Sequence, residues 1–204
     1  TNVQEEHGVP FMVLNTDWFV DGEGWIESLV AHEFNHASQF SYNVFWKETD
    51  WWYWESTAEW SFEGPYPDAN TWTYSLSSYF EAPYRSINSQ VGLVNYGHFS
   101  FNVVLAEQVD PAAPLLVWQV ADDNSTVSSA IDDALGTPIG ELLPLYTAHV
   151  AAYDVVEAGA WQDAATDFGV NPFTARVAEY PSEGAVDGKT APQWGGQTFF
   201  HFRG

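Results

Sequence analysis

The sequence has no cysteine among its 204 residues, which excludes disulfide bonds and thiolate ligands for a metal ion. Any tight transition-metal site must therefore use histidine and carboxylate side chains. Basic residues are also scarce, since 5 Lys and Arg stand against 28 Asp and Glu, for a formal net charge of −23. A surface of this sign repels nucleic-acid phosphates and anionic lipid headgroups, so we expect neither a nucleic-acid nor a membrane partner.

Long apolar runs are missing as well. No stretch approaches the ~18 apolar residues that cross a bilayer, and no basic-then-apolar signal sequence stands at the start. The acidity suits a protein that stays dissolved in saline or extracellular surroundings. Because the chain begins at Thr1 instead of methionine, we expect that a leader or propeptide has been removed from a secreted protein, or that the start was set artificially.

Apolar residues, in contrast, are plentiful. They make up 46% of the chain, which is enough for the core of one compact domain, and we expect a monomer. Residues 9–20, "VPFMVLNTDWFV", are rich in strand-forming types. Residues 25–40 predict a helix with apolar residues on two sides, which indicates burial between layers. Further helices are expected at 54–62, 71–81, 96–108, 114–121, 126–135 and 138–156.

The character of the chain changes from Trp161 onward. There "FTARVAEY" and "QTFFHF" predict strands separated by a linker rich in Gly, Pro and Ser. We therefore predict an α+β fold, mostly helical, in which an N-terminal strand layer packs on the 25–40 helix. Residues 1–160 would form the main domain, and residues 161–204 a β-rich extension or the start of an accessory module.

The pentapeptide "HEFNH" lies within the first predicted helix. Histidines at positions i and i+4 project from one face, so His32 and His36 can both reach one metal ion. Glu33 points about 100° away, close to a water molecule held by such an ion, and is the candidate base. The motif alone also fits an ordinary helix that carries two histidines. On a buried helix, however, these polar groups need partners, because each unsatisfied group costs ~1–3 kcal/mol.

A catalytic zinc site needs a third protein ligand and an open position. The segment "WWYWESTAEW" places Glu55 and Glu59 one turn apart on the next predicted helix, so either carboxylate could supply that ligand. Glu55 follows His36 by 19 positions, which is a comfortable length for the chain to turn and bring the second helix alongside.

These two elements resemble the gluzincin metallopeptidases, the thermolysin-like clan. Over residues 11–120, "AHEFNHASQFSY", "WWYWESTAEW" and "NYGHFSF" are similar to secreted bacterial metalloproteases with HEFxHxxQ and ExTAxW elements. The resemblance implies a zincin-like catalytic domain with His32, His36 and Glu55 as zinc ligands and Glu59 as a carboxylate that steadies a histidine. It implies a zinc-dependent endopeptidase, in which Glu33 activates a zinc-bound water to hydrolyse protein or peptide substrates. Asn35 and Ser56 depart from the pattern without removing a ligand.

The segment "NYGHFSF" offers a donor for the oxyanion that forms when water adds to a carbonyl carbon. Several gluzincins carry a tyrosine before a glycine at the start of a later helix, and the resemblance therefore points to Tyr96. His98 is the second candidate. Both residues could instead simply cap and pack a helix.

Other features leave alternatives open. The tryptophans that crowd between the proposed ligand helices either fill the core or line a cleft for apolar side chains or sugars: Trp46, Trp51, Trp52, Trp54 and Trp60. An aminopeptidase or a glycoprotein-directed peptidase of the same clan is therefore an alternative, and a non-catalytic metal-containing binding module is another. The acidic groups Asp17, Asp21 and Glu23, or Asp122 and Asp123, either bind structural Ca²⁺ or form a solvated face.

Overall fold

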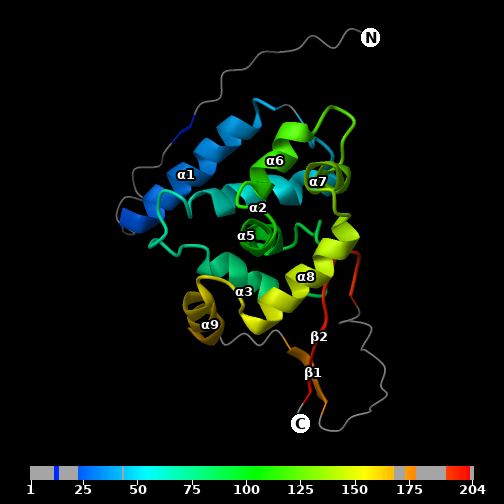
Figure 1. The fold of residues 1–204 in the computed structure, drawn as a ribbon. Coiled ribbons are helices and arrows are strands. Elements are labelled where there is room, and N and C mark those ends of the chain that lie inside the picture. The colour runs from blue at the N-terminus through cyan, green and yellow to red at the C-terminus, as the bar shows by residue number, and fades with distance from the viewer. Residues whose placement is uncertain (1–11, 14–22, 43, 168–172, 178–191, 203–204) are drawn as a thin grey trace.

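The structure is a computed structural model that describes residues 12–13, 23–42, 44–167, 173–177 and 192–202. It is mostly helical (Figure 1). The helices are α1 (Glu23–Gln39), α2 (Trp51–Ser61), α3 (Thr73–Glu81), α4 (Val94–Gly97), α5 (Phe99–Gln108), α6 (Ala113–Val120), α7 (Val127–Leu135), α8 (Ile139–Ala152) and α9 (Ala158–Asp167), with a short 3-10 turn, η2 (Glu48–Asp50), before α2. Among the described residues, no helix has both the length and the apolar character to cross a membrane.

The predicted α+β fold with a strand layer on the first helix is wrong. The described residues are mostly helical, and the core forms where helices pack on helices. Two short strands, β1 (Phe173–Val177) and β2 (Phe199–Phe202), pair in parallel and lie away from α1 in Figure 1. Residues 9–20 lie almost entirely outside the described residues, and Met12 and Val13 are exposed and belong to neither helix nor strand. Strand-forming residue types indicate only that side chains fit a half-buried pleated surface, and in the described residues helix α2, and not a sheet, packs on α1.

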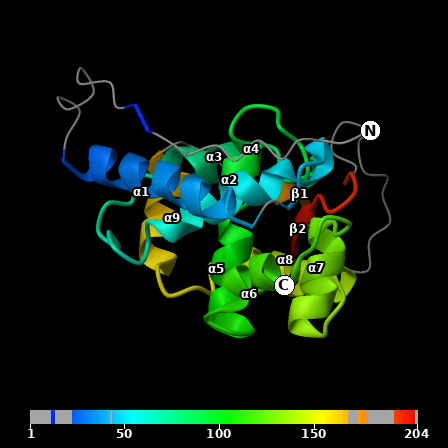
Figure 2. The same cartoon turned by 90° about the horizontal axis from the view of Figure 1, so that it is seen from above.

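The helix that packs between other helices is α2 and not α1. Helix α2 contacts α1, α4 and α5, and it buries most of its length, including Trp52, Tyr53 and Thr57. Figure 2 shows α1 lying along α2 at the edge of the molecule. The outer face of α1 leaves Phe34 65% exposed, so the prediction that α1 is buried between layers is also wrong.

Gly97 allows α4 to lie directly on α3. A Cβ atom at this position would lie 2.6 Å from Tyr79 Cβ and would clash with the Ser75 carbonyl oxygen. Only glycine permits so close an approach of two backbones. The contact fixes α4 and therefore the residue before Gly97, Tyr96, beside α1.

The C-terminal part of the chain contributes a helix that the sequence did not predict. Helix α9 crosses the predicted boundary at residue 160 and packs on α3, and the fully buried ring of its Trp161 contacts Trp72 and Phe99. Farther along, the Gln193 amide donates a hydrogen bond to the Tyr84 carbonyl at 2.8 Å, and Ile87 donates to the Trp194 carbonyl at 3.1 Å. The described parts of residues 161–204 therefore pack on the helical body.

Two carboxyl groups meet where α2 ends and α9 begins. Burial and the neighbouring Glu157 raise the pKa of Glu63 from 4.5 to about 8. Because the folded pKa lies above the unfolded one, the stabilising effect of this proton is complete below pH 4.5 and is lost as the pH rises through about 8. The pair therefore repels at alkaline pH.

We expect Glu157→Gln to raise the free energy of unfolding at pH 8 by about 1 kcal/mol, since solvent screens a half-buried pair. At pH 4.5 the gain should disappear, because the repulsion is already absent there. Urea unfolding at both pH values measures the difference, with Asp163→Asn on the exposed face of α9 as the matched control. An equal gain at both pH values would contradict the repulsion between the two carboxylates.

Candidate metal centre

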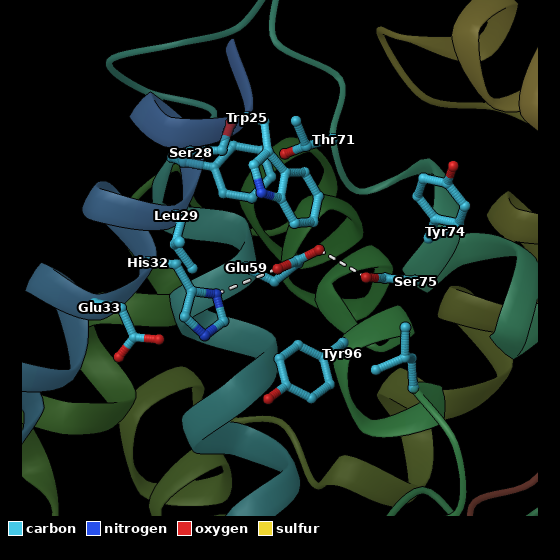
Figure 3. A pocket seen from close by; sticks show the side chains of 12 residues that line it. Trp25, Ser28, Leu29, His32, Glu33, Glu59, Thr71, Tyr74, Ser75 and Tyr96 are labelled. Carbon is cyan, nitrogen blue, oxygen red and sulfur yellow. Dashed lines mark hydrogen bonds and ion pairs between the residues drawn. The ribbon is translucent and has the colours of Figure 1, made fainter. Parts of the chain in front are cut away.

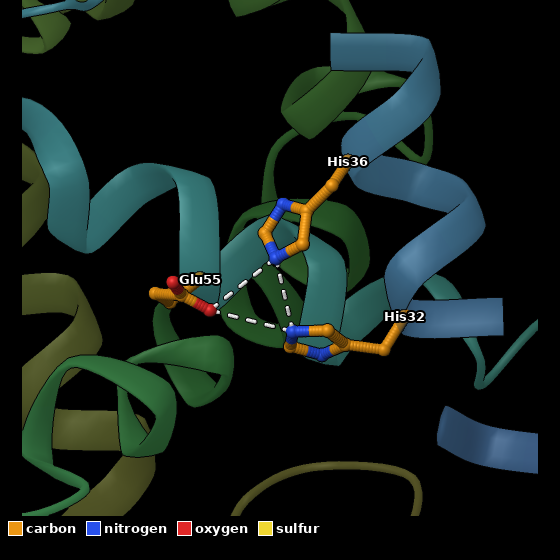
Figure 4. Close-up of side chains that lie close together, drawn as sticks. All are labelled: His32, His36 and Glu55. Carbon is orange, nitrogen blue, oxygen red and sulfur yellow. Dashed lines mark hydrogen bonds and ion pairs between the residues drawn. The ribbon is translucent and has the colours of Figure 1, made fainter. Parts of the chain in front are cut away.

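Three side chains from two adjacent helices converge on one point (Figure 4). His32 and His36 lie one turn apart on α1, and Glu55 reaches toward them from α2. His32 Nε2 lies 3.1 Å from His36 Nε2, and Glu55 Oε2 lies 3.3 Å from the first and 3.4 Å from the second. We call these three residues the ligand triad.

The spacing of the ligand triad fits a zinc ion. Ligands placed tetrahedrally at ~2.0–2.1 Å from zinc lie about 3.3–3.4 Å from one another, which is the edge of the tetrahedron. The three donor atoms form such a triangle face and leave the fourth corner open. Glu55 Oε2 is also buried without a hydrogen bond of regular geometry, as a metal ligand would be. The cluster can therefore hold a metal ion.

His32 is oriented by a carboxylate on its other ring nitrogen. Glu59 Oε2 lies 3.2 Å from His32 Nδ1, and the Ser75 hydroxyl donates to Glu59 Oε1 at 2.7 Å (Figure 3). A proton on Nδ1 that is held by Glu59 leaves the Nε2 lone pair for the metal ion. The structure thus separates two carboxylates that the sequence left as alternatives: Glu55 lies in the ligand triad, whereas Glu59 lies behind it.

His36 is oriented by an amide instead. The Gln39 amide nitrogen donates to the Trp54 carbonyl at 3.0 Å and to the Thr57 hydroxyl at 2.8 Å, so its oxygen must be the atom that faces the ring. That oxygen lies 2.7 Å from His36 Nδ1. The proton is therefore on Nδ1, and His36 Nε2 presents a lone pair to the ligand triad. No role was predicted for Gln39, although its position three residues after His36 was the available signal.

The negative charge of the carboxylates at the site favours a bound cation. Burial lowers the pKa of His32, but the neighbouring carboxylates of Glu55 and Glu59 outweigh it and raise the pKa to about 9. Burial likewise raises the pKa of Glu55, yet the two imidazoles outweigh it and lower the pKa to about 2. In the absence of a metal ion the carboxylates thus hold a proton on His32. A divalent cation would neutralise the same negative charge.

Tyr96 lies against the ligand triad and His98 does not. The Tyr96 ring stacks on His32 at 5.6 Å, and burial together with the charge of Glu55 raises the pKa of its hydroxyl, which therefore keeps its proton. His98 is buried between Trp52 and Tyr79, with Nδ1 3.4 Å from the Tyr146 hydroxyl. Burial lowers the pKa of His98 to about 3. The structure thus does not bring this second donor candidate to the site, because its helix turn faces the core.

Two hollows flank the ligand triad and share Glu33, which is exposed beside His32 on α1 (Figure 3). The larger hollow, of about 690 Å³, lies on the side of His32 and is lined mainly by Trp25, Leu29, Phe62, Tyr74, Leu93 and Tyr96. The second, of about 370 Å³, we call the aromatic hollow, and it is lined by Glu33, His36, Phe40, Trp46, Trp51, Trp54, Glu55, Gln90 and Asn95. A chain laid across the ligand triad would reach both hollows.

The tryptophans between the two helices divide between core and surface. Trp52 and Trp54 are buried and Trp60 is partly buried, whereas Trp46 and Trp51 are 52% and 46% exposed. For calcium, Asp17 and Asp21 lie outside the described residues. In the described part of the chain, no other group of three histidine or acidic side chains converges as the ligand triad does. Asp122 instead accepts hydrogen bonds from its own turn, at 2.9 Å from the Asn124 amide.

No protein-family model, no curated protein and no solved structure matches this chain. The resemblance to gluzincins therefore stays a prediction that rests on the motifs, and the geometry of the ligand triad is an observation independent of it.

If the ligand triad holds a metal ion, we expect Gln39→Leu to weaken its binding by about 10- to 100-fold, because His36 loses the acceptor that fixes its tautomer. Gln39→Glu should recover only part of the affinity, since its carboxylate still accepts from Nδ1 but can no longer donate to the Trp54 carbonyl. Competition with a chromophoric chelator measures the dissociation constant. Ser38→Ala, an exposed change on the same helix, is the control. Equal affinity in the Leu and Glu variants would show that the hydrogen bond to His36 does not matter.

Proposed function

We propose that the protein is a secreted, monomeric, zinc-dependent endopeptidase that hydrolyses peptide bonds in protein or peptide substrates. The observation that carries the proposal is the ligand triad, whose three donors lie at the mutual spacing of tetrahedral zinc ligands, with a carboxylate and a phenol beside its open corner. When bound there, zinc would polarise a carbonyl group and lower the pKa of water to about 7.

Each remaining group has a role that follows from its position. Glu33 is exposed at the meeting point of the two hollows, where it can take a proton from the attacking water and return it to the leaving amine. Tyr96 keeps its phenolic proton and can donate a hydrogen bond to the carbonyl oxygen as negative charge develops on it. Glu59 and Gln39 hold the two imidazoles in the tautomer that binds metal.

The two hollows favour an endopeptidase over an aminopeptidase. An aminopeptidase binds a free chain end, which needs a pocket that closes on one side of the metal ion. Here the larger hollow is lined by His32, the aromatic hollow by His36 and Glu55, and both by Glu33, so a substrate chain that passes the metal site can occupy a hollow before it and another after it. A non-catalytic metal module has no use for a carboxylate at position 33, which makes it the weaker alternative.

The test is metal-dependent cleavage by the purified protein. Zinc-loaded protein should digest unfolded casein, lose this activity after treatment with a chelator, and regain it when zinc is restored. Amino-acid anilides and mucin serve as the comparison substrates. Faster hydrolysis of the anilides would favour an aminopeptidase, and cleavage of mucin alone a glycoprotein-directed peptidase. A metal content near zero at micromolar zinc would contradict the site itself.

We expect Tyr96→Phe to lower kcat by about 100- to 1,000-fold with little change in KM, because one donor to the developing oxyanion is lost. Zinc content should not change, since the phenol is not one of the ligands. Tyr74→Phe, which removes a hydroxyl from the same larger hollow, is the matched control. A loss that appears in KM alone would place Tyr96 in substrate binding instead of oxyanion stabilisation.

A further inference from the structure

We propose that the aromatic hollow binds an aromatic or large apolar side chain of the peptide substrate, on a residue that adjoins the cleaved bond, and that Asn95 hydrogen-bonds to the main chain of that residue. The proposal rests on the proposed peptidase function. His36 and Glu55 of the ligand triad line the same hollow, so a side chain bound there lies next to the metal site.

The rings of the hollow hold one another in place, and Phe40 and Trp46 keep about half of their surface exposed. Phe40, Trp46 and Trp54 contact one another with ring centroids 5.2 to 5.8 Å apart, and the Trp54 indole donates to the Phe45 carbonyl at 3.1 Å. Phe45 itself is buried in a left-handed backbone conformation with a φ of 62°, which a bulky residue rarely adopts. This anchored turn leaves Trp46 52% exposed, so the aromatic hollow is formed before any ligand binds.

Asn95 supplies the polar group. It is only 7% exposed, lines the aromatic hollow, and carries an Oδ1 atom that is buried without a hydrogen-bond partner in the described part of the chain. Buried amides are rarely left unpaired, so this group marks a place where a ligand donor belongs. Asn95 precedes Tyr96 on α4 and shares the aromatic hollow with His36 and Glu55, so a donor bound there lies close to the ligand triad.

The polar groups of the hollow favour a peptide over a sugar. A sugar needs several hydrogen-bonding groups for its hydroxyls together with a flat aromatic face. Glu33 and Glu55 already have roles at the metal site, and the Gln90 amide donates to the Glu48 carbonyl. Asn95 is therefore the amide of the hollow that remains to bind a ligand. The rings are tilted from one another by 35° to 59°, which offers both faces and edges to an aromatic side chain.

The first experiment measures specificity. Peptides that vary only at the residues adjoining the cleaved bond should show a preference for Phe, Tyr, Trp or Leu over Ala at one of these positions. Trp46→Ala should reduce that preference, as a ratio of kcat/KM values, by at least about 10-fold. Asn95→Ala should lower kcat/KM for the Phe and Ala peptides alike, because the main chain is common to both. Trp194→Ala, 56% exposed and outside both hollows, is the control. An unchanged preference in Trp46→Ala would overturn the proposal.

The second experiment measures binding without catalysis. The probe is N-acetyl-4-fluoro-L-phenylalanine amide, titrated by ¹⁹F NMR into the zinc-loaded Glu33→Gln variant, with and without Trp46→Ala. Binding should weaken at least about 10-fold in the double variant, and the corresponding alanine amide should not displace the probe. Tighter binding of N-acetylglucosamine than of the probe would overturn the proposal in favour of a sugar site. Binding of the probe to a protein that cleaves no peptide would support the subsite while contradicting the peptidase function.

Discussion

Glu33→Gln is expected to reduce the rate of peptide hydrolysis by about 100- to 10,000-fold while zinc stays bound. The carboxylate is outside the ligand triad, so the amide removes a proton acceptor without removing a ligand. Glutamine has the same shape, and Glu33 is exposed, so the fold should be undisturbed. The expected result is a protein with full zinc content, an unchanged melting temperature and almost no turnover.

The measurement combines metal analysis with single-turnover kinetics on a fluorogenic peptide. Glu27→Gln, an exposed change two turns earlier on α1, is the matched control and should keep full activity. If Glu33→Gln retained full activity, Glu33 would not be the base, and a proton acceptor would have to be sought elsewhere in the two hollows. Loss of zinc in this variant would instead show that Glu33 has a structural part in the metal site.

Glu55→Ala is expected to lose the metal ion, and activity with it. The change removes one of three donors and leaves two imidazoles that are turned toward an empty corner. The loss of affinity should exceed the roughly 10- to 100-fold expected when a group that only orients a ligand is removed. A metal ion held by the ligand triad would stabilise the folded state, so in this variant added zinc should no longer raise the melting temperature.

Glu59→Gln separates the two carboxylates of α2. Its amide oxygen can still accept from His32 Nδ1, so zinc should bind more weakly than in wild type but more tightly than in Glu55→Ala. Zinc titrations of the three proteins followed by calorimetry measure this order. The reverse order, with normal zinc content in Glu55→Ala, would make Glu59 the third ligand and would require the His32 ring to present its other nitrogen.

Much of the site could be predicted because helical spacing determines it. Histidines at positions 32 and 36 must share a face of any helix, and a carboxylate 19 positions after the second can return beside them. The choice between Glu55 and Glu59 could not be derived in this way, since both lie one turn apart on the same face of α2. That choice depends on the rotation of α2 against α1, which long-range packing of rings such as Trp118 on Tyr53 and Trp54 sets.

The fold was less predictable than the site. Helices α3, α6 and α7 lie close to their predicted ranges because proline, glycine and capping residues mark their ends; Thr126, for example, caps α7 through the Ser129 amide. Strand propensity could not show what a strand packs on, because it describes only a side chain's fit to a sheet, and the described part of the chain places no sheet on α1. Helix α9 was missed because it is short and Trp161 is its one large apolar residue; packing on α3, with burial of Trp161, Ala164 and Ala165, stabilises it.

Gln39 has one further consequence, for engineering. Its amide binds a metal ligand on one side and the backbone of α2 on the other, so the free energy of holding the ion and that of keeping the two helices together are linked through a single side chain. A series of replacements at position 39 would therefore change, in steps, the rate at which a bound ion exchanges with solution, while all three ligands stay unchanged.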